Sequence, residues 1–202
     1  AERSGPLTDL WKFDPRTLEW TWVAGDNVSG RPGFFGTMGQ PGPSNSPGGI
    51  VDAATWTDAD DNLWLFGGQK LGGLQNALWK FDTTSLEWTW ISGSDAGNQA
   101  GSYGTMGVAS ASNVPGARRN ALCWPGDDGE LLVFGGYGYA ASASGHLNDL
   151  WRFNPDTLED TAAERCGKAC YECLLDYGNQ PDHLLLDRFV IRDVLAQLAK
   201  AT

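Results

Sequence analysis

Three cysteines that lie close together are the residues of this chain best suited to chemistry. Cys166, Cys170 and Cys173 fall within eight residues of one another. Structural Zn²⁺ sites are tetrahedral and are built from Cys thiolates and His nitrogens, so three thiols at this spacing suit such a site. The group is therefore a candidate zinc site that still needs a fourth ligand.

Two residues elsewhere are candidates for that fourth ligand. Cys123 lies in a predicted strand, and His183 lies ten residues after Cys173. His183 also follows Pro181 and Asp182, a pattern that favours a surface residue at the start of a helix. Two other interpretations stay open. The three thiols are unligated, or two of them form a disulfide, although their odd number fits a disulfide framework poorly.

A run of acidic residues is the other candidate cation site. Asp58, Asp60, Asp61 and Asn62 resemble a calcium-binding loop, but the Gly and the distal Glu of such a loop are missing. The corresponding residues of the repeat described below, 126–130, have the pattern of a hairpin turn. We therefore predict a turn here rather than a calcium site.

The remaining polar residues do not form a catalytic pattern. Arg118 and Arg119 are adjacent, and we interpret them as part of a solvated loop, with ligand contact as the alternative. A copper site would need clustered His and Tyr, but His146 is the one His before residue 160. The chain also lacks the phosphate-binding pattern GxxxxGK[ST]. We therefore expect no enzymatic activity and, apart from zinc near the three cysteines, no cofactor.

A repeated run organises most of the chain. The sequence LWKFD followed by LEWTW occupies residues 10–22 and returns 68 residues later at 78–90. A third copy begins another 72 residues on, at Leu150, and stops matching at Asp160. Repeats at such a spacing indicate an array of similar units rather than one irregular domain.

Each unit is predicted to contain two β-hairpins. The repeated run alternates large apolar and polar residues on both sides of a turn, as hairpins do. A second pair of alternating segments, 53–56 and 63–68, ends in a glycine pair, and its counterpart 68 residues later also ends in Gly-Gly. Such pairs let backbones approach closely or turn sharply. One period therefore contains four strands.

These motifs, together with Phe66, Phe134 and the run 148–151, resemble the kelch repeat, specifically the long-looped, Trp-rich bacterial kind related to the propeller of galactose oxidase. The resemblance covers about residues 7–159. It implies a mainly β fold, a partial β-propeller of about two and a quarter four-stranded blades: two strands of one blade, all of a second and three of a third. The residues that carry the repeat are Trp11, Trp20, Gly67, Gly68, Trp79, Trp88, Gly135, Gly136 and Trp151.

Residues 160–202 differ in character. All ten Trp lie before this segment, whereas three of the four Cys lie in it. Residues 187–200 place apolar side chains on one stripe at helical spacing, which predicts a short α-helical tail. Through the run 166–188, the tail 160–202 resembles, over about 35 residues, the C-terminal end of the cysteine-rich zinc-binding domain of MrfA-type bacterial helicases. That resemblance implies that the three thiols are zinc ligands and that the fourth is a cysteine further upstream. We therefore divide the chain into domains 1–159 and 160–202.

Charge and hydropathy narrow the range of partners. The net charge is −11 and Lys and Arg are not clustered, which argues against nucleic-acid binding. No apolar run reaches about 18 residues, so no membrane span is expected. The first residues also lack the pattern of a signal peptide. The compartment stays open, because the propeller resemblance suggests export or the cell surface whereas the tail suggests the cytoplasm.

We predict a non-catalytic binding module. Loops on one face of a propeller present an adaptable surface to a protein or glycan, and the Gly-rich loops after Trp22 and Trp90 are the expected carriers. The Trp residues could stack on sugars, but their fixed place in the repeat favours packing. Uncovered blade faces would favour self-association. The alternatives are an accessory zinc-binding segment of a DNA-repair helicase, or a fusion or truncated fragment without a function of its own.

Overall fold

The computed structural model describes residues 5–126, 129–155 and 159–162, and its regular elements there are all β-strands. The predicted mainly β fold is therefore confirmed, and the strands pair in several antiparallel sheets. Within these residues no helix is long and apolar enough to cross a membrane. The predicted helical tail, residues 187–200, lies outside the described part of the chain.

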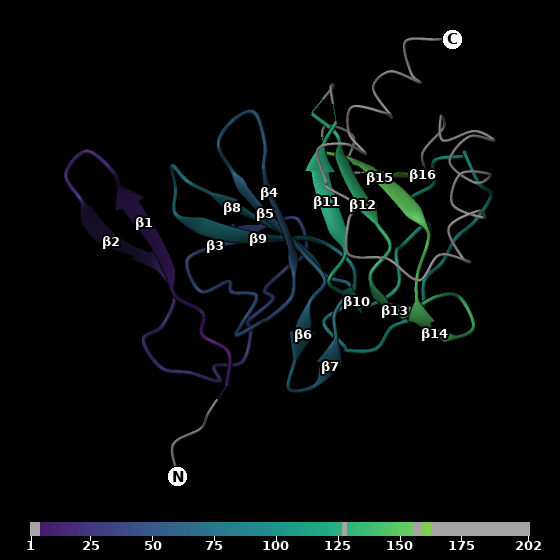
Figure 1. The fold of residues 1–202 in the computed structure, drawn as a ribbon, viewed down its shortest axis with the longest axis horizontal. Helices are drawn as coiled ribbons and strands as arrows, with labels where there is room; N and C mark the ends of the chain where they lie inside the picture. The colour runs from purple at the N-terminus through teal and green to yellow at the C-terminus, as the bar shows by residue number, and fades with distance from the viewer. Residues whose placement is uncertain (1–4, 127–128, 156–158, 163–202) are drawn as a thin grey trace, which may run out of the picture. The chain divides into compact units, whose positions relative to one another are not determined.

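In the described residues sixteen strands form five sheets (Figure 1). Two of these sheets are large and three have only two or three strands. The strands are β1 (Leu10–Asp14), β2 (Glu19–Ala24), β3 (Pro41–Gly42), β4 (Ala54–Thr57), β5 (Leu63–Phe66), β6 (Gln69–Lys70), β7 (Gly73–Leu74), β8 (Leu78–Asp82), β9 (Glu87–Ser92), β10 (Arg118–Arg119), β11 (Leu122–Pro125), β12 (Leu131–Phe134), β13 (Tyr137–Tyr139), β14 (Ser144–His146), β15 (Leu150–Asn154) and β16 (Glu159–Ala162).

The two large sheets share one topology. The five-stranded sheet has the order β3-β9-β8-β5-β4, and the four-stranded sheet has the order β11-β12-β15-β16. We call β1 and β2 the first copy of the repeat, β4, β5, β8 and β9 the second, and β11, β12, β15 and β16 the third. Each copy includes the loop residues at corresponding repeat positions. In the second copy and in the third, the four strands lie side by side in the order in which they follow one another in the sequence. This is the meander expected from two successive hairpins.

Identical turns close the hairpins of the first and second copies. The backbone N–H of Leu18 donates to the carbonyl of Asp14, and Leu86 donates to Asp82 in the same way, both at 2.8 Å. Both leucines have a φ of 61°, in the left-handed region that non-glycine residues seldom adopt. The repeated sequence therefore repeats its backbone conformation as well as its pattern.

The third copy is completed by a fourth strand that the sequence did not predict. The match to the repeat fails at Asp160, so the repeat pattern predicts only three strands for this copy. In the structure β16 pairs with β15, placing Ala162 opposite Trp151. Strand pairing uses main-chain groups, so it does not require the missing Trp side chains. The pairing also extends past residue 159, where we divided the chain.

The core lies between the second and third copies. In β5 and β15 alternate residues are buried, as expected for strands with one covered face. The ring centroids of Trp64 and Phe153 are 5.8 Å apart, which joins the two copies directly. Each large apolar side chain buried in this way contributes about 1.5–3 kcal/mol. The cluster consists of Ala54, Trp56, Trp64, Phe66, Leu78, Leu131, Val133, Trp151 and Phe153.

The glycine pairs behave as the sequence predicts. Gly67 and Gly68 have φ values of 69° and 91°, and Gly135 and Gly136 have 65° and 92°. A Cβ atom on Gly67 would lie 2.6 Å from the carbonyl oxygen of Arg118, a contact that no side chain tolerates. Glycine is therefore needed at these positions both for the left-handed turn and for close backbone approach.

The repeat Trp residues differ in burial between the copies. Trp79 and Trp151 are buried, and Trp88 is half-buried. Trp11 and Trp20, which occupy the same sequence positions in the first copy, are 48% and 64% exposed. The predicted role in packing therefore holds for the second and third copies. In the first copy the same side chains face solvent, because no strand of the described residues pairs with β1 other than β2.

Candidate functional site

The predicted zinc ligands Cys166, Cys170 and Cys173, and the candidate ligand His183, lie outside the described residues. Cys123 lies on β11, where its Sγ donates to the carbonyl of Thr55 at 3.0 Å. Among residues 5–126, 129–155 and 159–162, no group of three or more His, Cys, Asp or Glu side chains could hold a metal ion. The zinc site therefore stays a prediction from the sequence.

The acidic run after β4 is a hairpin turn, as predicted. Asp58 accepts hydrogen bonds from the backbone N–H groups of Asp60 and Asn62, and from the Nε1 of Trp64 at 2.8 Å. Burial alone would raise the pKa of Asp58, but the hydrogen bonds from Trp64 and Asn62 outweigh it and hold the pKa below its usual value. The carboxylate therefore organises the turn and anchors a core Trp.

The interpretation of Arg118 as part of a solvated loop is wrong. Its side chain is completely buried and forms a bidentate pair with Asp149, with N···O distances of 2.6 and 2.7 Å. The guanidinium also donates to the carbonyls of Gly116 and Gly135. A buried guanidinium needs such complete pairing because an unpaired charge in the interior is costly. Arg118 is thus a structural cation.

Two more donors complete the environment of Asp149. The hydroxyl of Tyr103 and the Nε1 of Trp151 both donate to its Oδ2 at 2.7 Å. We call Tyr103, Arg118, Asp149 and Trp151 the Asp149 cluster. Burial would raise the pKa of Asp149, but Arg118 and Trp151 lower it below its usual value. Burial, together with Asp149, raises the pKa of Tyr103 to about 12. The cluster therefore keeps one charge state near neutral pH, as a structural network does.

The second copy has an apolar set at the corresponding positions. Phe35, Ile50 and Ala77 stand where the third copy has Tyr103, Arg118 and Asp149. The ring of Phe35 packs 4.8 Å from Trp79 and 5.0 Å from Trp90. All three positions differ together, polar in one copy and apolar in the other. This joint difference is the sequence signal for the Asp149 cluster, and the interpretation of Arg118 as a loop residue did not use it.

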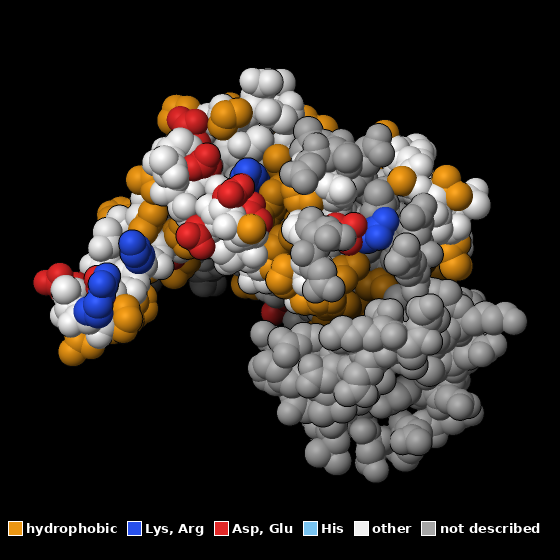
Figure 2. Space-filling view, turned by 90° about the horizontal axis from the view of Figure 1, so that it is seen from above, with side chains coloured by type: hydrophobic (Ala, Val, Ile, Leu, Met, Phe, Trp, Pro, Cys, Tyr) orange, Lys and Arg blue, Asp and Glu red, His pale blue; other side chains and the backbone are white. Residues whose placement is uncertain are grey.

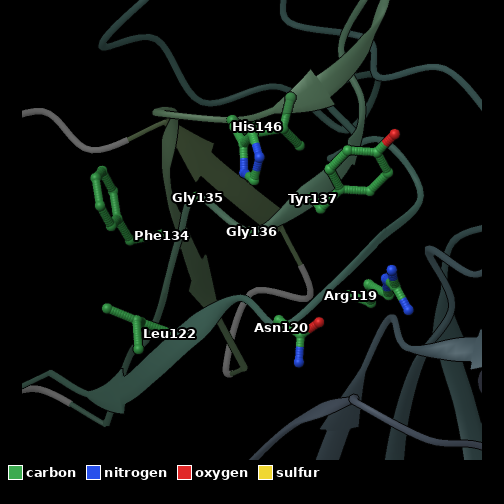
Figure 3. A pocket seen from close by; sticks show the side chains of 9 residues that line it. Arg119, Asn120, Leu122, Phe134, Gly135, Gly136, Tyr137 and His146 are labelled. Atoms are coloured by element: carbon green, nitrogen blue, oxygen red, sulfur yellow. The ribbon is translucent and has the colours of Figure 1, made fainter. Parts of the chain in front are cut away.

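A cavity in the described residues lies beside the second glycine pair and has a volume of about 460 Å³. Figure 3 shows Leu122 and Phe134 on one side of it, Tyr137 and Arg119 on the other, and the ring of His146 between them. A ligand here would meet both apolar and polar groups. We call this cavity the Gly136 pocket, and it is lined by Arg119, Asn120, Leu122, Phe134, Gly135, Gly136, Tyr137, His146 and Leu147.

Side-chain contacts fix the polar wall of the Gly136 pocket. The guanidinium of Arg119 lies 5.8 Å from the centre of the Tyr137 ring and donates to Gln69 Oε1 at 2.8 Å. It also lies 3.6 Å from a carboxylate oxygen of Asp52. The edge of His146 approaches the Tyr137 ring, with centroids 5.4 Å apart. Arg119 is therefore held from two sides before any ligand arrives.

Two backbone groups at the Gly136 pocket have counterparts in the second copy, and those counterparts are hydrogen-bonded there. In the second copy Gly68 N–H donates to the carbonyl of Arg118 at 2.7 Å, and Arg118 N–H donates to the carbonyl of Gln75 at 2.9 Å. The corresponding groups of the third copy are the N–H of Gly136 and the C=O of Leu147, which line the pocket. Among the described residues neither group has a hydrogen-bond partner. The pocket therefore presents one donor and one acceptor spaced for an extended backbone.

The Gly136 pocket was not predicted from the sequence, which pointed instead to the loops after Trp22 and Trp90. The pocket lies where no segment of the described residues covers the third copy in the way that the Arg118 segment covers the second. Leu122 is accordingly 52% exposed, whereas its counterpart Ala54 is 4% exposed. A comparison of the chain with protein-family models finds no match, and a search of curated proteins finds none either.

Proposed function

We propose that the chain is a non-catalytic protein-binding module built from kelch-like propeller blades. The antiparallel meanders of the second and third copies support this architecture, because four short strands in sequence order are what a blade contains. Face-to-face packing of these copies through the Trp64–Phe153 contact fits neighbouring blades. With β16 included, the described chain contributes two strands of one blade and four of each of the next two.

The ligand that the Gly136 pocket fits best is an extended peptide segment of a partner protein. The observation that carries this proposal is the pairing seen in the second copy, where the backbone of Arg118 occupies the same position on Gly68 and Gln75. A peptide residue that donates to Leu147 and accepts from Gly136 would repeat that pairing. Peptide recognition by addition of backbone hydrogen bonds is a common mode of binding.

Side chains around the two backbone groups would add selectivity. Leu122 and Phe134 offer apolar contact, while Asn120 and His146 offer hydrogen-bonding groups. Each hydrogen bond contributes about 1 kcal/mol net. Two such bonds with a small apolar contact lead to weak binding, with a Kd on the order of 1 mM. Tight binding would require contacts beyond the pocket.

A peptide taken from the chain itself is the appropriate probe. Residues 113–121 form the segment that docks on the second copy, so a synthetic peptide of this sequence should bind the Gly136 pocket of the intact chain. In ¹⁵N-labelled protein we expect the largest amide shifts at Gly136 and at its neighbours Tyr137 and Leu147. Leu122→Glu should weaken binding at least tenfold, because it places a charge against the apolar side of the pocket.

The matched control is Leu71→Glu, which adds the same charge at an exposed leucine of the second copy. It should leave the affinity unchanged. Equal weakening by both variants, or no peptide-dependent shift at Gly136, would overturn the proposal. Shifts at Gly136 produced by soluble polysaccharides but not by the peptide would replace it with glycan binding.

The accessory zinc function stays a separate proposal. It rests on the spacing of Cys166, Cys170 and Cys173 and on the helicase resemblance. Metal analysis of the purified chain should then find one equivalent of Zn²⁺, and Cys173→Ser should remove it, since a structural zinc site needs its full ligand set. A chain that carries no tightly bound zinc would contradict this function.

A further inference from the structure

The first copy repeats the sequence of the second, but among the described residues it has no counterpart of β4 and β5. In the second copy the edge of β8 that faces away from β9 is paired with β5. Trp79 and Phe81 on β8 are each 1% exposed. Their counterparts Trp11 and Phe13 are 48% and 41% exposed. Figure 2 shows hydrophobic side chains at the surface of this part of the molecule, at the left of the view. The edge of β1 opposite β2 is therefore an unpaired strand edge among the described residues.

A carboxylate at this edge indicates which partner it fits. Asp9 precedes Leu-Trp as Asp149 does in the third copy, and Trp11 donates to Asp9 Oδ2 at 2.7 Å as Trp151 donates to Asp149. In the third copy the same carboxylate also receives the Arg118 guanidinium and the Tyr103 hydroxyl. In the described residues Trp11 is the hydrogen-bond partner found for Asp9.

We call the residues at the positions of Arg118 and Asp149 in one copy a junction. In the second and third copies the two residues of the junction match in polarity. Where the third copy has Asp149 the covering residue is Arg118, and where the second copy has Ala77 the corresponding residue is Ile50. An aspartate beneath an aliphatic cover would be a buried charge without a cation, which is strongly unfavourable. Asp9 therefore belongs to the arginine type of junction and not to the isoleucine type.

We propose that the edge formed by Asp9, Trp11 and Phe13 binds an arginine-bearing β-hairpin of a partner protein. The partner's inner strand pairs antiparallel with β1, and the arginine before its hairpin forms a bidentate pair with Asp9. In the third copy Val133 lies opposite Trp151, so the same register places an aliphatic residue opposite Trp11. Arginine is required because its planar guanidinium matches a carboxylate in two parallel hydrogen bonds, which lysine does not.

A folded second copy of this chain does not meet the requirement, because its Arg118 is buried on its own Asp149. The occupant is therefore a different hairpin of the same type, and this proposal is independent of the Gly136 pocket. The probe is a synthetic peptide of residues 113–136, which contains Arg118, β11 and β12. It is titrated against the full chain carrying Leu122→Glu, so that the Gly136 pocket binds its first residues at least tenfold more weakly.

We expect the peptide to bind this chain and Asp9→Ala to weaken the binding at least tenfold. A peptide with Arg118→Ile should bind the chain with unchanged Asp9 at least tenfold more weakly. Its affinity should recover on the Asp9→Ala chain, because the two changes together recreate the pair Ile50 and Ala77 of the second copy. Arg118→Lys in the peptide should also weaken binding. Glu19→Ala removes the same charge from an exposed position of the hairpin and should change nothing.

The proposal would be overturned if the affinity were the same for the matched pairs (arginine in the peptide with Asp9, isoleucine with Asp9→Ala) and for the mismatched pairs. An Asp9→Ala effect no larger than that of Glu19→Ala would overturn it too, because simple charge attraction would then explain both. Concentration-dependent association of the chain itself, abolished by Asp9→Ala, would assign the edge to self-association instead. Absence of any binding by the peptide to the Asp9 chain would also reject it.

Discussion

In the second copy of the repeat Phe35 packs between two Trp rings, and Ile50 and Ala77 stand at the neighbouring positions. In the third copy Tyr103 packs against Trp151 and also donates to Asp149, which is paired with Arg118. The backbone of the two junctions is alike, down to the φ values of the glycine pairs. The same backbone arrangement therefore accommodates three apolar side chains in one copy and three polar side chains in the other.

The difference shows that these positions are interchangeable only as a group. A buried carboxylate needs its cation and its other donors, whereas an apolar set has no polar group to satisfy. Changing one member of the polar set should therefore cost more stability than changing all of them. Variants of the two junctions can test this difference.

Replacing Arg118 alone should destabilise the chain most. Arg118→Met keeps much of the side-chain volume but leaves Asp149 buried without a cation, and loss of one partner of a buried pair typically costs about 3–5 kcal/mol. Urea denaturation followed by Trp fluorescence would measure the change in the free energy of unfolding. An unchanged midpoint would contradict the assignment of Arg118 as a structural cation.

The matched control transfers the whole apolar set to the third copy. The triple variant Tyr103→Phe, Arg118→Ile, Asp149→Ala should recover most of the stability that Arg118→Met loses, because replacing a complete buried ion pair with apolar groups is often nearly neutral. If the triple variant is as unstable as the single one, the two junctions are not interchangeable as sets.

The stability of the polar junction should depend on pH at both extremes. The native pKa of Asp149 is lowered, so its contribution is present above the unfolded pKa of about 3.9 and is lost as the pH falls through the native value. The native pKa of Tyr103 is raised to about 12. Its contribution is present below the unfolded pKa of about 10 and is lost between there and the native value.

The triple variant supplies the comparison for this pH dependence, since it lacks both groups. Its free energy of unfolding should fall less than that of the natural sequence below about pH 4 and above about pH 10, near the reference pKa values of Asp and Tyr. Denaturation at a series of pH values would measure the difference. Parallel pH profiles for the two chains would show that other groups dominate.

A smaller difference is expected at two equivalent asparagines. Asn45 in the second copy donates to the carbonyls of Gln40 and Trp88, whereas Asn113 in the third donates to that of Val108. The Oδ1 of Asn113 is buried and has no hydrogen-bond partner in the part of the chain that the structure describes. Asn45→Ala should therefore cost about 1 kcal/mol more than Asn113→Ala, the net value of one hydrogen bond. Thermal unfolding of both variants would measure this, and equal losses would argue against it.

The strands and turns were predictable because they depend on local sequence. Alternation of apolar residues located β4 and β5, and the glycine pairs marked turns that require positive φ. The turn at Asp58 was also predicted, although its hydrogen bond to Trp64 was not. Such features depend on residues within about ten positions of one another.

The contacts between residues far apart in the sequence were not predictable in the same way. Arg118 and Asp149 are separated by 31 residues, and their pairing depends on how sheets stack. An arginine next to another arginine looks like a solvated pair until the cover above it is known. Trp11 and Trp79 also have the same neighbours in sequence but different exposure. Burial at these positions depends on the strands and loops that pack over them rather than on the local sequence.

The hydrogen bonds that join Arg118 to Gly68 and Gln75 involve only main-chain atoms. The side chain at that position can therefore change without loosening the attachment of the third copy to the second. A gene that lengthens by duplicating a whole unit keeps every such attachment, and each new unit is then free to acquire its own chemistry. In the second and third copies the glycine pair is the same, whereas the residue at the position of Arg118 differs.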